Sequence, residues 1–333
     1  MGSTINDIAR EAGVSIATVS RVINGSAQVT EDTKQKVKKV MDKLNYSPSL
    51  IARGLKLKSM KNIALFVSSF LNVHHMRIAH EINSHFSKLD YDVVMYETGN
   101  SAEGLARAMK RIIEKGMDGA IFIGSSFQVL LEKSEETKKL ISSIPITIAN
   151  GWVEGTYGIF VDEYKGMKDA VKHLVAMNRR RLLYLKGTDS ISSDNKLAGF
   201  IEGCKEEGLE EFTHIRSEND VETTRRLFDE RNLASKYDGI ICDEDNYALV
   251  VIKTLKRLGV RVPEDVAVIG CNNSDFSSLS SPGITTVNNK PEDQGIECAI
   301  ILDEILSKGS RLEKEILITI EPELVIREST LLS

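Results

Sequence analysis

Residues 4–24 read TINDIAREAGVSIATVSRVIN, and this stretch decides how the N-terminal part of the chain folds. Apolar residues recur at helical spacing on both sides of Gly13, which predicts one helix over 5–12 and a second over 16–24. A side chain that can act as a cap precedes each helix, Thr4 for the first and Ser15 for the second. Two short helices joined by a turn that contains glycine are typical of a helix-turn-helix.

A third helix is predicted after these two, with Thr30 as its cap. Its apolar residues fall at i, i+3, i+4 and i+7 and form one stripe, made by Val37, Val40, Met41 and Leu44. The first two helices supply facing stripes, made by Ile5, Ile8, Ala9, Val19 and Val22. Pro48 ends this three-helix unit. Residues 50–58 are compatible with a helix except at Gly54, but the segment is too short to be stable alone, so we expect it to fold on a partner.

The pattern changes after Asn62 to short, continuous apolar runs that alternate with amphipathic helices. The runs are 63–67, 93–96, 120–123, 146–149, 182–185, 239–242 and 266–269. Continuous runs suit strands that are buried on both faces, and hence parallel sheets with helical crossovers. The sequence therefore predicts an α/β body of one or two doubly wound lobes, with ligands at the carboxyl ends of the strands.

Charge is distributed unevenly along the chain. Residues 1–58 carry ten Lys or Arg and five Asp or Glu, whereas the net charge of the whole chain is -5. A basic head on an acidic body favours an anionic polymer as the partner of the head. The alternative is that the Lys-rich helix is only a solvated face.

The composition narrows the class of protein. A length of 333 residues suits about two domains, and no run approaches the ~18 apolar residues that a membrane-spanning helix needs. The N-terminus shows no basic start or apolar segment of a secretory signal, so we expect a cytoplasmic protein. The cysteines are scattered and are expected to be small buried residues: Cys204, Cys242, Cys271 and Cys298.

Catalytic signatures are few. The sequence contains no G-x-S-x-G, Walker A, G-x-G-x-x-G or H-E-x-x-H motif, and we expect no cofactor. Four histidines lie close together at a spacing that suits a metal site poorly, namely His74, His75, His80 and His85. The acidic loop 243–245 follows a predicted strand and could serve an enzyme, but capping of the next helix is the commoner role. An enzyme is therefore disfavoured.

The opening stretch closely resembles the head of lactose-repressor (LacI) family transcription regulators, and its Ile16-Ala17 pair is similar to that of catabolite-control-type members. The resemblance continues in YSPS (46–49), ARGL (52–55), RVPEDV (261–266), PGITTV (282–287) and LVIREST (324–330). It implies a sequence-specific DNA-binding regulator, in the first instance a repressor, that binds a pseudo-palindromic operator as a dimer under the control of a small molecule. The alternatives are a small-molecule-binding protein without a DNA-regulatory role and, less favoured, an enzyme.

The resemblance implies two sets of DNA contacts. The second helix enters the major groove, where Arg21 can read guanine, and short polar residues contact phosphates. A hinge helix enters the minor groove, where Leu55 wedges between base pairs. The alternatives are an ordinary helix surface for Thr18 and Ser20, and packing on the body for Leu55. The implied residues are Thr4, Ile5, Ser15, Ile16, Ala17, Thr18, Ser20, Arg21, Asn24, Ser49, Ala52, Arg53, Leu55 and Lys56.

For the body, the resemblance implies two lobes like those of periplasmic sugar-binding proteins, with the effector in the cleft between them. The implied divisions are a head at 1–47, a hinge at 48–59, and lobes at 60–160 with 291–323 and at 161–290 with 324–333. The implied effector residues are His74, His75, Ser125, Asn150, Lys196, Asn219, Asp245 and Asn272.

Several of these residues depart from the family pattern: Asn219 falls near a position often held by a stacking aromatic, and Asn150 occupies a usual Asp position. Lys196 stands where a ligand-binding Arg is usual, and Asn272 stands where a sugar-binding Asp is usual. The exchange removes a rigid bidentate donor and one ionic acceptor. Two His, one Lys and several amides suit an acidic or phosphorylated small molecule, or a changed pocket whose polar residues are merely solvated. No heptad tail follows Thr330, so we expect a homodimer without a coiled-coil tetramer, and no membrane partner.

Overall fold

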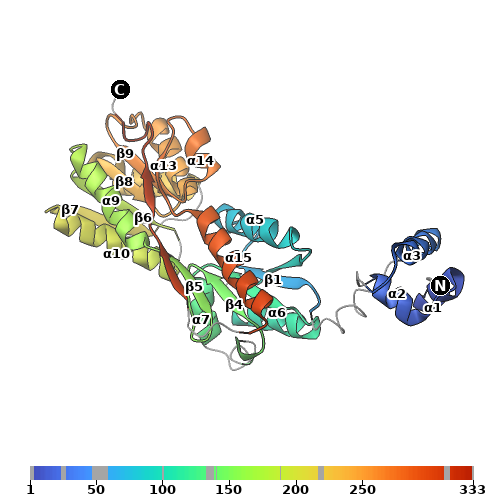
Figure 1. Ribbon diagram of the computed structural model, residues 1–333. Coiled ribbons are helices and arrows are strands. Elements are labelled where there is room, and N and C mark those ends of the chain that lie inside the picture. The colour runs from blue at the N-terminus through green and yellow to red at the C-terminus, as the bar shows by residue number, and fades with distance from the viewer. Residues whose placement is uncertain are drawn as a thin grey trace. The chain divides into compact units, whose positions relative to one another are not determined.

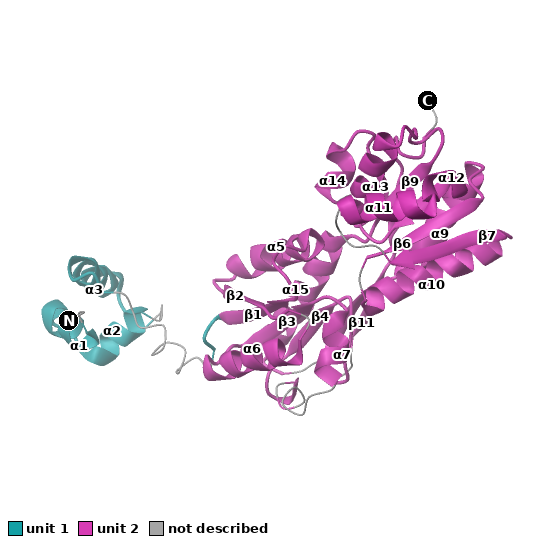
Figure 2. Ribbon diagram, turned by 180° about the vertical axis from the view of Figure 1, so that it is seen from behind, with its two compact units in different colours: residues 1–61 teal, residues 62–333 magenta. Residues whose placement is uncertain are grey.

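The computed structural model describes residues 4–23, 28–46, 59–99, 101–132, 139, 141–187, 189–216, 221–310 and 316–331. The chain divides into two units, residues 1–61 and 62–333, which are drawn in different colours in Figure 2. Among the described residues, no helix has both the length and the apolar character needed to cross a bilayer.

Three helices form the head, with bounds α1 (Ile5–Ala12), α2 (Ile16–Ile23) and α3 (Glu31–Lys43). The Thr4 hydroxyl accepts the Asp7 N–H at 3.4 Å, and the Thr4 N–H donates to the Asp7 carboxylate at 3.0 Å, a capping box that fixes the start of α1. Ser15 caps α2 as expected, since its hydroxyl accepts the Thr18 N–H at 3.1 Å. The expected side-chain cap of α3 is wrong, because the Thr30 hydroxyl pairs with the Thr33 hydroxyl at 2.9 Å instead.

The head has its own apolar core. Ile8, Ala12, Val19 and Val37 are completely buried in it, and the rest of the predicted stripes pack around them. The three-helix core predicted from helical spacing is therefore confirmed.

The first lobe of the larger unit, the N-terminal lobe, is a six-stranded sheet in the order β11-β5-β4-β3-β1-β2, with every neighbouring pair parallel. Its strands are β1 (Asn62–Val67), β2 (Asp92–Glu97), β3 (Gly119–Ile123), β4 (Ile146–Ala149), β5 (Tyr157–Val161) and β11 (Leu317–Ile320). The helices α5 (Val73–Ser87) and α15 (Pro291–Lys308) lie side by side on one face (Figure 1). The other face is covered by α6 (Ala102–Glu114) and α7 (Ser126–Glu132).

The second lobe, the C-terminal lobe, is a six-stranded sheet in the order β12-β10-β9-β8-β6-β7. Its strands are β6 (Arg181–Lys186), β7 (Glu211–Arg216), β8 (Gly239–Cys242), β9 (Ala267–Cys271), β10 (Thr285–Asn288) and β12 (Glu323–Val325). The pair of β10 with β12 is antiparallel, and the other pairs are parallel. Its helices are α9 (Glu163–Ala176), α10 (Ile191–Glu206), α11 (Val221–Arg231), α12 (Leu233–Lys236), α13 (Asp245–Arg257) and α14 (Asp275–Leu279).

Both sheets are sandwiched between helices, as continuous apolar strands require. On β1, Leu65 packs toward α5 and α15 while Phe66 packs toward α6 and α7, and both are completely buried. The two-lobed α/β fold expected for the body is confirmed, and the four cysteines are buried and free. The chain passes between the lobes after β5, after β10 and after β11.

Candidate functional site

One face of the second helix of the head, α2, carries exposed side chains. Val19 and Val22 are buried in the head core, whereas Ile16, Ala17 and Arg21 are exposed. Ile16 is 50% exposed and is not part of the head core. A short helix with an exposed apolar pair and one exposed Arg can enter a major groove and contact base edges.

The other described head residues expected to contact DNA have roles within the head. The hydroxyls of Ser15 and Thr18 lie 2.9 Å apart at the start of α2, and the Thr4 hydroxyl belongs to the capping box of α1. Ile5 packs against the core, and Ser20 is partly buried on α2. Six expected DNA contacts lie outside the described residues: Asn24, Ser49, Ala52, Arg53, Leu55 and Lys56.

A cavity of about 160 Å³ separates the two lobes. Residues that directly follow β1, β3, β4, β8 and β9 line it, so it lies at the carboxyl ends of both sheets. Six expected effector residues line it: His74, His75, Ser125, Asn150, Lys196 and Asn272. Asp245 lines a second cavity of about 240 Å³ that shares Asn272 and His74 with the first. Asn219 lies outside the described residues.

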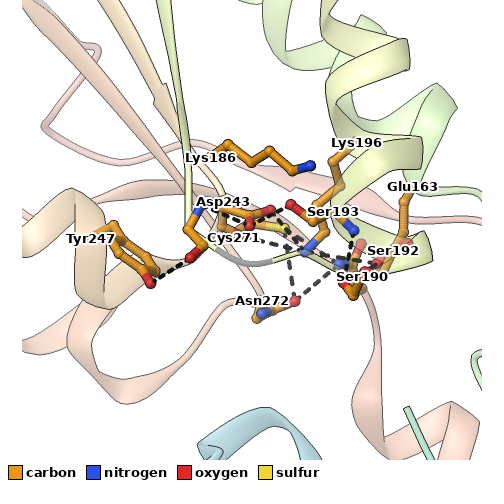
Figure 3. A network of polar contacts seen from close by, with 12 residues as sticks. Glu163, Lys186, Ser190, Ser192, Ser193, Lys196, Asp243, Tyr247, Cys271 and Asn272 are labelled. Atoms are coloured by element: carbon orange, nitrogen blue, oxygen red, sulfur yellow. Dashed lines mark hydrogen bonds and ion pairs between the residues drawn. The ribbon is translucent and has the colours of Figure 1, made fainter. Parts of the chain in front are cut away.

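Lys196 on α10 is the buried cation of this cavity (Figure 3). Its Nζ lies 3.6 Å from Asp243 Oδ1 and 3.8 Å from Glu163 Oε1, and it donates to the Asp243 carbonyl at 3.3 Å. Burial alone would lower the pKa of Lys196, but the anionic neighbours outweigh burial and hold the pKa above its ordinary value. The ammonium is therefore charged, and it is already paired by two carboxylates.

Asp243 is fully engaged in the protein. Its carboxylate accepts the Tyr184 hydroxyl at 3.0 Å, the Ser193 hydroxyl at 2.8 Å and the Gly187 N–H at 3.1 Å. Burial would raise the pKa of Asp243, but Lys196 and these donors lower it below its ordinary value, so the group is ionised. The expectation that the acidic loop caps the next helix is wrong, because Glu244 at the cap position of α13 makes no side-chain cap hydrogen bond.

Asp245 also has its partners within the C-terminal lobe. The Thr286 hydroxyl donates to Oδ1 at 2.6 Å, and the N–H and hydroxyl of Ser274 donate to Oδ2 at 2.6 and 2.8 Å. Burial raises the pKa of Asp245 to about 6. A Cβ at Gly270 would lie 2.2 Å from Oδ1, so the glycine makes room for this carboxylate. Asp245 thus ties β9, β10 and α13 together behind the cleft.

His74 and His75 begin α5, where the Asn72 side chain accepts the His75 N–H at 3.0 Å. The Nδ1 atoms of both rings are buried without a partner among the described residues. Burial lowers the pKa of His74 well below its ordinary value, and burial with the Lys196 charge lowers the pKa of His75 to about 4. A Cβ at Gly124 would lie 2.9 Å from the His75 ring, so this glycine admits the imidazole. Both rings are neutral at pH 7.

His75 should make the protein sensitive to acid. The unfolded chain takes up a proton near pH 6.5 and the folded chain only near pH 4, so the free energy of unfolding falls as the pH drops through this window. We expect the loss between pH 7.5 and pH 5 to be about 2 kcal/mol smaller in His75→Gln, measured by urea unfolding. His80→Gln, at an exposed position of the same helix, should leave the loss unchanged. Equal losses in the native protein and His75→Gln would contradict the assignment.

Several cavity residues were not expected from the sequence. Glu163 accepts the Ser192 hydroxyl at 2.5 Å and the Asn150 amide at 3.4 Å, and Glu244 lines both cavities. The Ser192 N–H donates to the Ser125 hydroxyl at 3.1 Å, which links the two lobes. Glu163 and Glu244 each lie two residues after a strand ends, β5 and β8, and that position is the signal that could have found them, whereas Ser192 lies on α10. No group of three His, Cys, Asp or Glu with a metal-site arrangement occurs in the described part of the chain.

Comparison with known proteins agrees with both parts of the structure. Residues 4–49 match the family model "Bacterial regulatory proteins, lacI family", and residues 171–330 match "Periplasmic binding protein-like domain". The structure of the lac repressor dimer bound to operator and the anti-inducer ONPF superposes with a TM-score of 0.86 over 100% of both chains, at 23% identity. That likeness shows a shared fold.

Similar sequences cover nearly the whole chain. An HTH-type transcriptional regulator of Lachnoclostridium phytofermentans is 32% identical over 335 residues, which cover 98% of this chain and 99% of that protein. The HTH-type transcriptional repressor PurR of Mannheimia succiniciproducens is 30% identical over 337 residues, with 98% of both chains covered. Both relatives are named as transcription regulators. The chain belongs to the lacI family of bacterial regulatory proteins and is a DNA-binding transcription regulator.

Proposed function

We propose that two copies of this chain bind an inverted-repeat operator and repress transcription, and that a small molecule in the cleft changes the affinity for DNA. The observation that carries the proposal is the exposed face of α2, where Arg21 stands beside Ile16 and Ala17. A bidentate contact of Arg with guanine gives about 1–3 kcal/mol of discrimination. The apolar pair suits thymine methyl groups. A two-fold operator requires a two-fold dimer.

We assign a separate function to each of the three divisions expected from the sequence. We assign DNA reading to the head at 1–47, minor-groove binding to the hinge at 48–59, and effector binding and dimerisation to residues 60–333. Within that body we take 60–160 with 291–323 as one lobe and 161–290 with 324–333 as the other. We expect the protein to act in the cytoplasm, where its proposed operator DNA lies.

Hydrogen bonds across the cleft join the two lobes, and a bound effector can strengthen or break them. Arg77 on α5 donates to the carbonyls of Asn272 and Asn273 at 3.1 and 2.7 Å, and thereby joins the N-terminal lobe to the C-terminal lobe. A ligand changes DNA binding only through its different affinity for the DNA-competent and incompetent states. We infer that the ligand selects one arrangement of the lobes through these contacts.

Selection of bound DNA from a random pool tests the proposal. Full-length protein should enrich an inverted repeat with guanine in each half-site, and the enrichment should change when the active metabolite is added. The matched Arg21→Ala protein should lose the preference at the guanine position. An absence of preference for any inverted repeat over bulk DNA, with and without metabolites, would overturn the proposed function.

The hinge segment offers a separate prediction, which rests on the family resemblance because Leu55 lies outside the described residues. A leucine wedge unstacks a base step and kinks the duplex, so Leu55→Ala should weaken operator binding and reduce DNA bending without altering the fold. Gel shifts and circularly permuted fragments measure the two effects. Unchanged affinity and bend angle would refute the wedge.

A further inference from the structure

The cleft holds more negative than positive charge. Among the described residues that line the cavity, Lys196 is the one Lys or Arg, and the carboxylates of Glu163 and Asp243 stand 3.8 and 3.6 Å from its Nζ. Glu244 adds a third carboxyl group, and both histidines are neutral at pH 7. The buried ammonium is therefore compensated before any ligand enters.

The remaining charges near the cleft are paired elsewhere. Asp189 at the cavity forms ion pairs with Arg216 and, at 3.5 Å, with Lys186. Arg77 forms an ion pair with Glu292 at 2.8 Å and donates to two backbone carbonyls. No free cation faces the cavity from these groups, so an anionic ligand would meet net repulsion.

One buried acceptor in the cavity wall lacks a donor. Glu163 is 3% exposed, and its Oε1 accepts the Ser192 hydroxyl, but its Oε2 is buried with no hydrogen-bond partner among the described residues. Leaving a buried carboxylate oxygen unpaired is costly, and a charged donor is the strongest remedy. The side chain of Glu244, at the cap position of α13, makes no cap hydrogen bond. Both groups belong to the wall of the same cavity.

The rest of the wall is made of neutral polar groups. Side-chain hydroxyls and amides line it, and they suit the hydroxyls of a small polyol: Ser125, Ser126, Ser190, Asn150 and Asn272. The unpaired Nδ1 atoms of His74 and His75 add two further hydrogen-bonding positions. The wall thus combines sites for neutral hydroxyls with two carboxyl groups, those of Glu163 and Glu244.

We propose that the effector of this cleft is an amino sugar or a similar amine-bearing polyol, whose ammonium group donates to Glu163 Oε2 and pairs with Glu244. The inference rests on the proposed function of the cleft as an effector site, and it replaces the acidic or phosphorylated ligand expected from the sequence. That expectation counted Lys196 as a free cation, whereas two carboxylates compensate its charge.

Titration calorimetry on the full-length protein tests the ligand class with matched compounds. The probes are glucosamine, galactosamine and mannosamine, the three parent hexoses, and the three hexose 6-phosphates. At least one amine should bind ten-fold or more tightly than its parent hexose, and no 6-phosphate should bind more tightly than its parent. Tighter binding of a hexose or of a 6-phosphate than of every amine overturns the inference, and so does the failure of all three amines to bind.

Two variants locate the amine, and a third serves as the control. Glu163→Gln and, independently, Glu244→Gln should weaken amine binding about ten-fold and change binding of the parent hexose less than about three-fold. Asp194→Asn removes an exposed carboxylate of α10 that pairs with Lys186 and should change neither affinity. Circular dichroism confirms that the variants are folded. Unchanged amine affinity in both glutamine variants overturns the assignment of the amine to these two carboxyl groups.

The DNA selection experiment tests the proposed DNA-regulatory function independently of the ligand class. A protein that enriches an inverted repeat but binds no amine keeps the proposed DNA-regulatory function and loses only the ligand class. A protein that shows no DNA preference loses the proposed function, whatever the calorimetry shows.

Discussion

Lys196→Met should lower the free energy of unfolding of the body by about 3–5 kcal/mol, because it leaves two buried carboxylates without their cation. Asp243 and Glu163 are 1% and 3% exposed, and neither can turn to water. Methionine fills nearly the same volume, so the loss reports charge and not a cavity. Urea unfolding followed by circular dichroism measures it.

Two further variants test the cause of that loss. Lys186→Met removes a lysine whose partners Asp194 and Asp189 are exposed, so the change should stay within about 1 kcal/mol. Adding Glu163→Gln to Lys196→Met should recover part of the stability, since one uncompensated charge is then removed. Equal losses for the two single lysine variants would show that the buried pairing contributes nothing.

Arg21→Ala should reduce affinity for the operator about ten- to a hundred-fold, the second large effect. Arg21 is exposed on α2 and the head core does not use it, so the variant head should keep its fold. Gel shifts or fluorescence anisotropy at fixed salt measure the affinity, and melting of the purified protein checks the fold.

Arg21→Lys is the matched control for charge. Lysine keeps the positive charge but lacks the rigid fork that grips guanine O6 and N7. We expect binding to non-specific DNA and its salt dependence to match those of the native protein, while the preference for guanine falls. If lysine restores full sequence preference, Arg21 acts through phosphate attraction and does not read bases.

Seven of the twelve described strands overlap runs predicted from the sequence, among them the edge strand β2, and the runs miss β5, β7, β10, β11 and β12. The runs at 146–149 and 239–242 are β4 and β8 as the structure has them, because a strand covered on both faces is apolar throughout. β7 and β11 lie at sheet edges and alternate between exposed and half-buried residues, so no continuous run marks them. β12 is three residues long and pairs antiparallel with β10, a contact between distant segments that no local pattern reports.

The sequence predicts part of the cleft, but not how its charged residues pair. Strand ends and the family resemblance brought His74, His75 and Lys196 to one cavity. The pairing of Lys196 with Glu163 and Asp243 joins residues 33 and 47 positions apart in the chain, and their compensation of charge follows only from the folded geometry. The acidic loop 243–245 is expected to cap the next helix because that is the common role of acids at such a place, whereas in the structure Asp243 is bound by Ser193, Tyr184 and Lys196.

The return of the chain to the N-terminal lobe after β10 affects the order in which the lobes can fold during synthesis. The N-terminal lobe needs α15 to cover one face of its sheet and β11 to complete its edge, and both follow most of the C-terminal lobe in the chain. During synthesis on the ribosome, Leu65 and Ile121 therefore have no Leu302 or Ile305 to pack against until most of the C-terminal lobe has been made. The described core of the head lies within residues 5–46 and can form early. The nascent chain thus has a folded head and an incomplete N-terminal lobe with exposed apolar surface. Chaperones bind such partly folded states and prevent their aggregation.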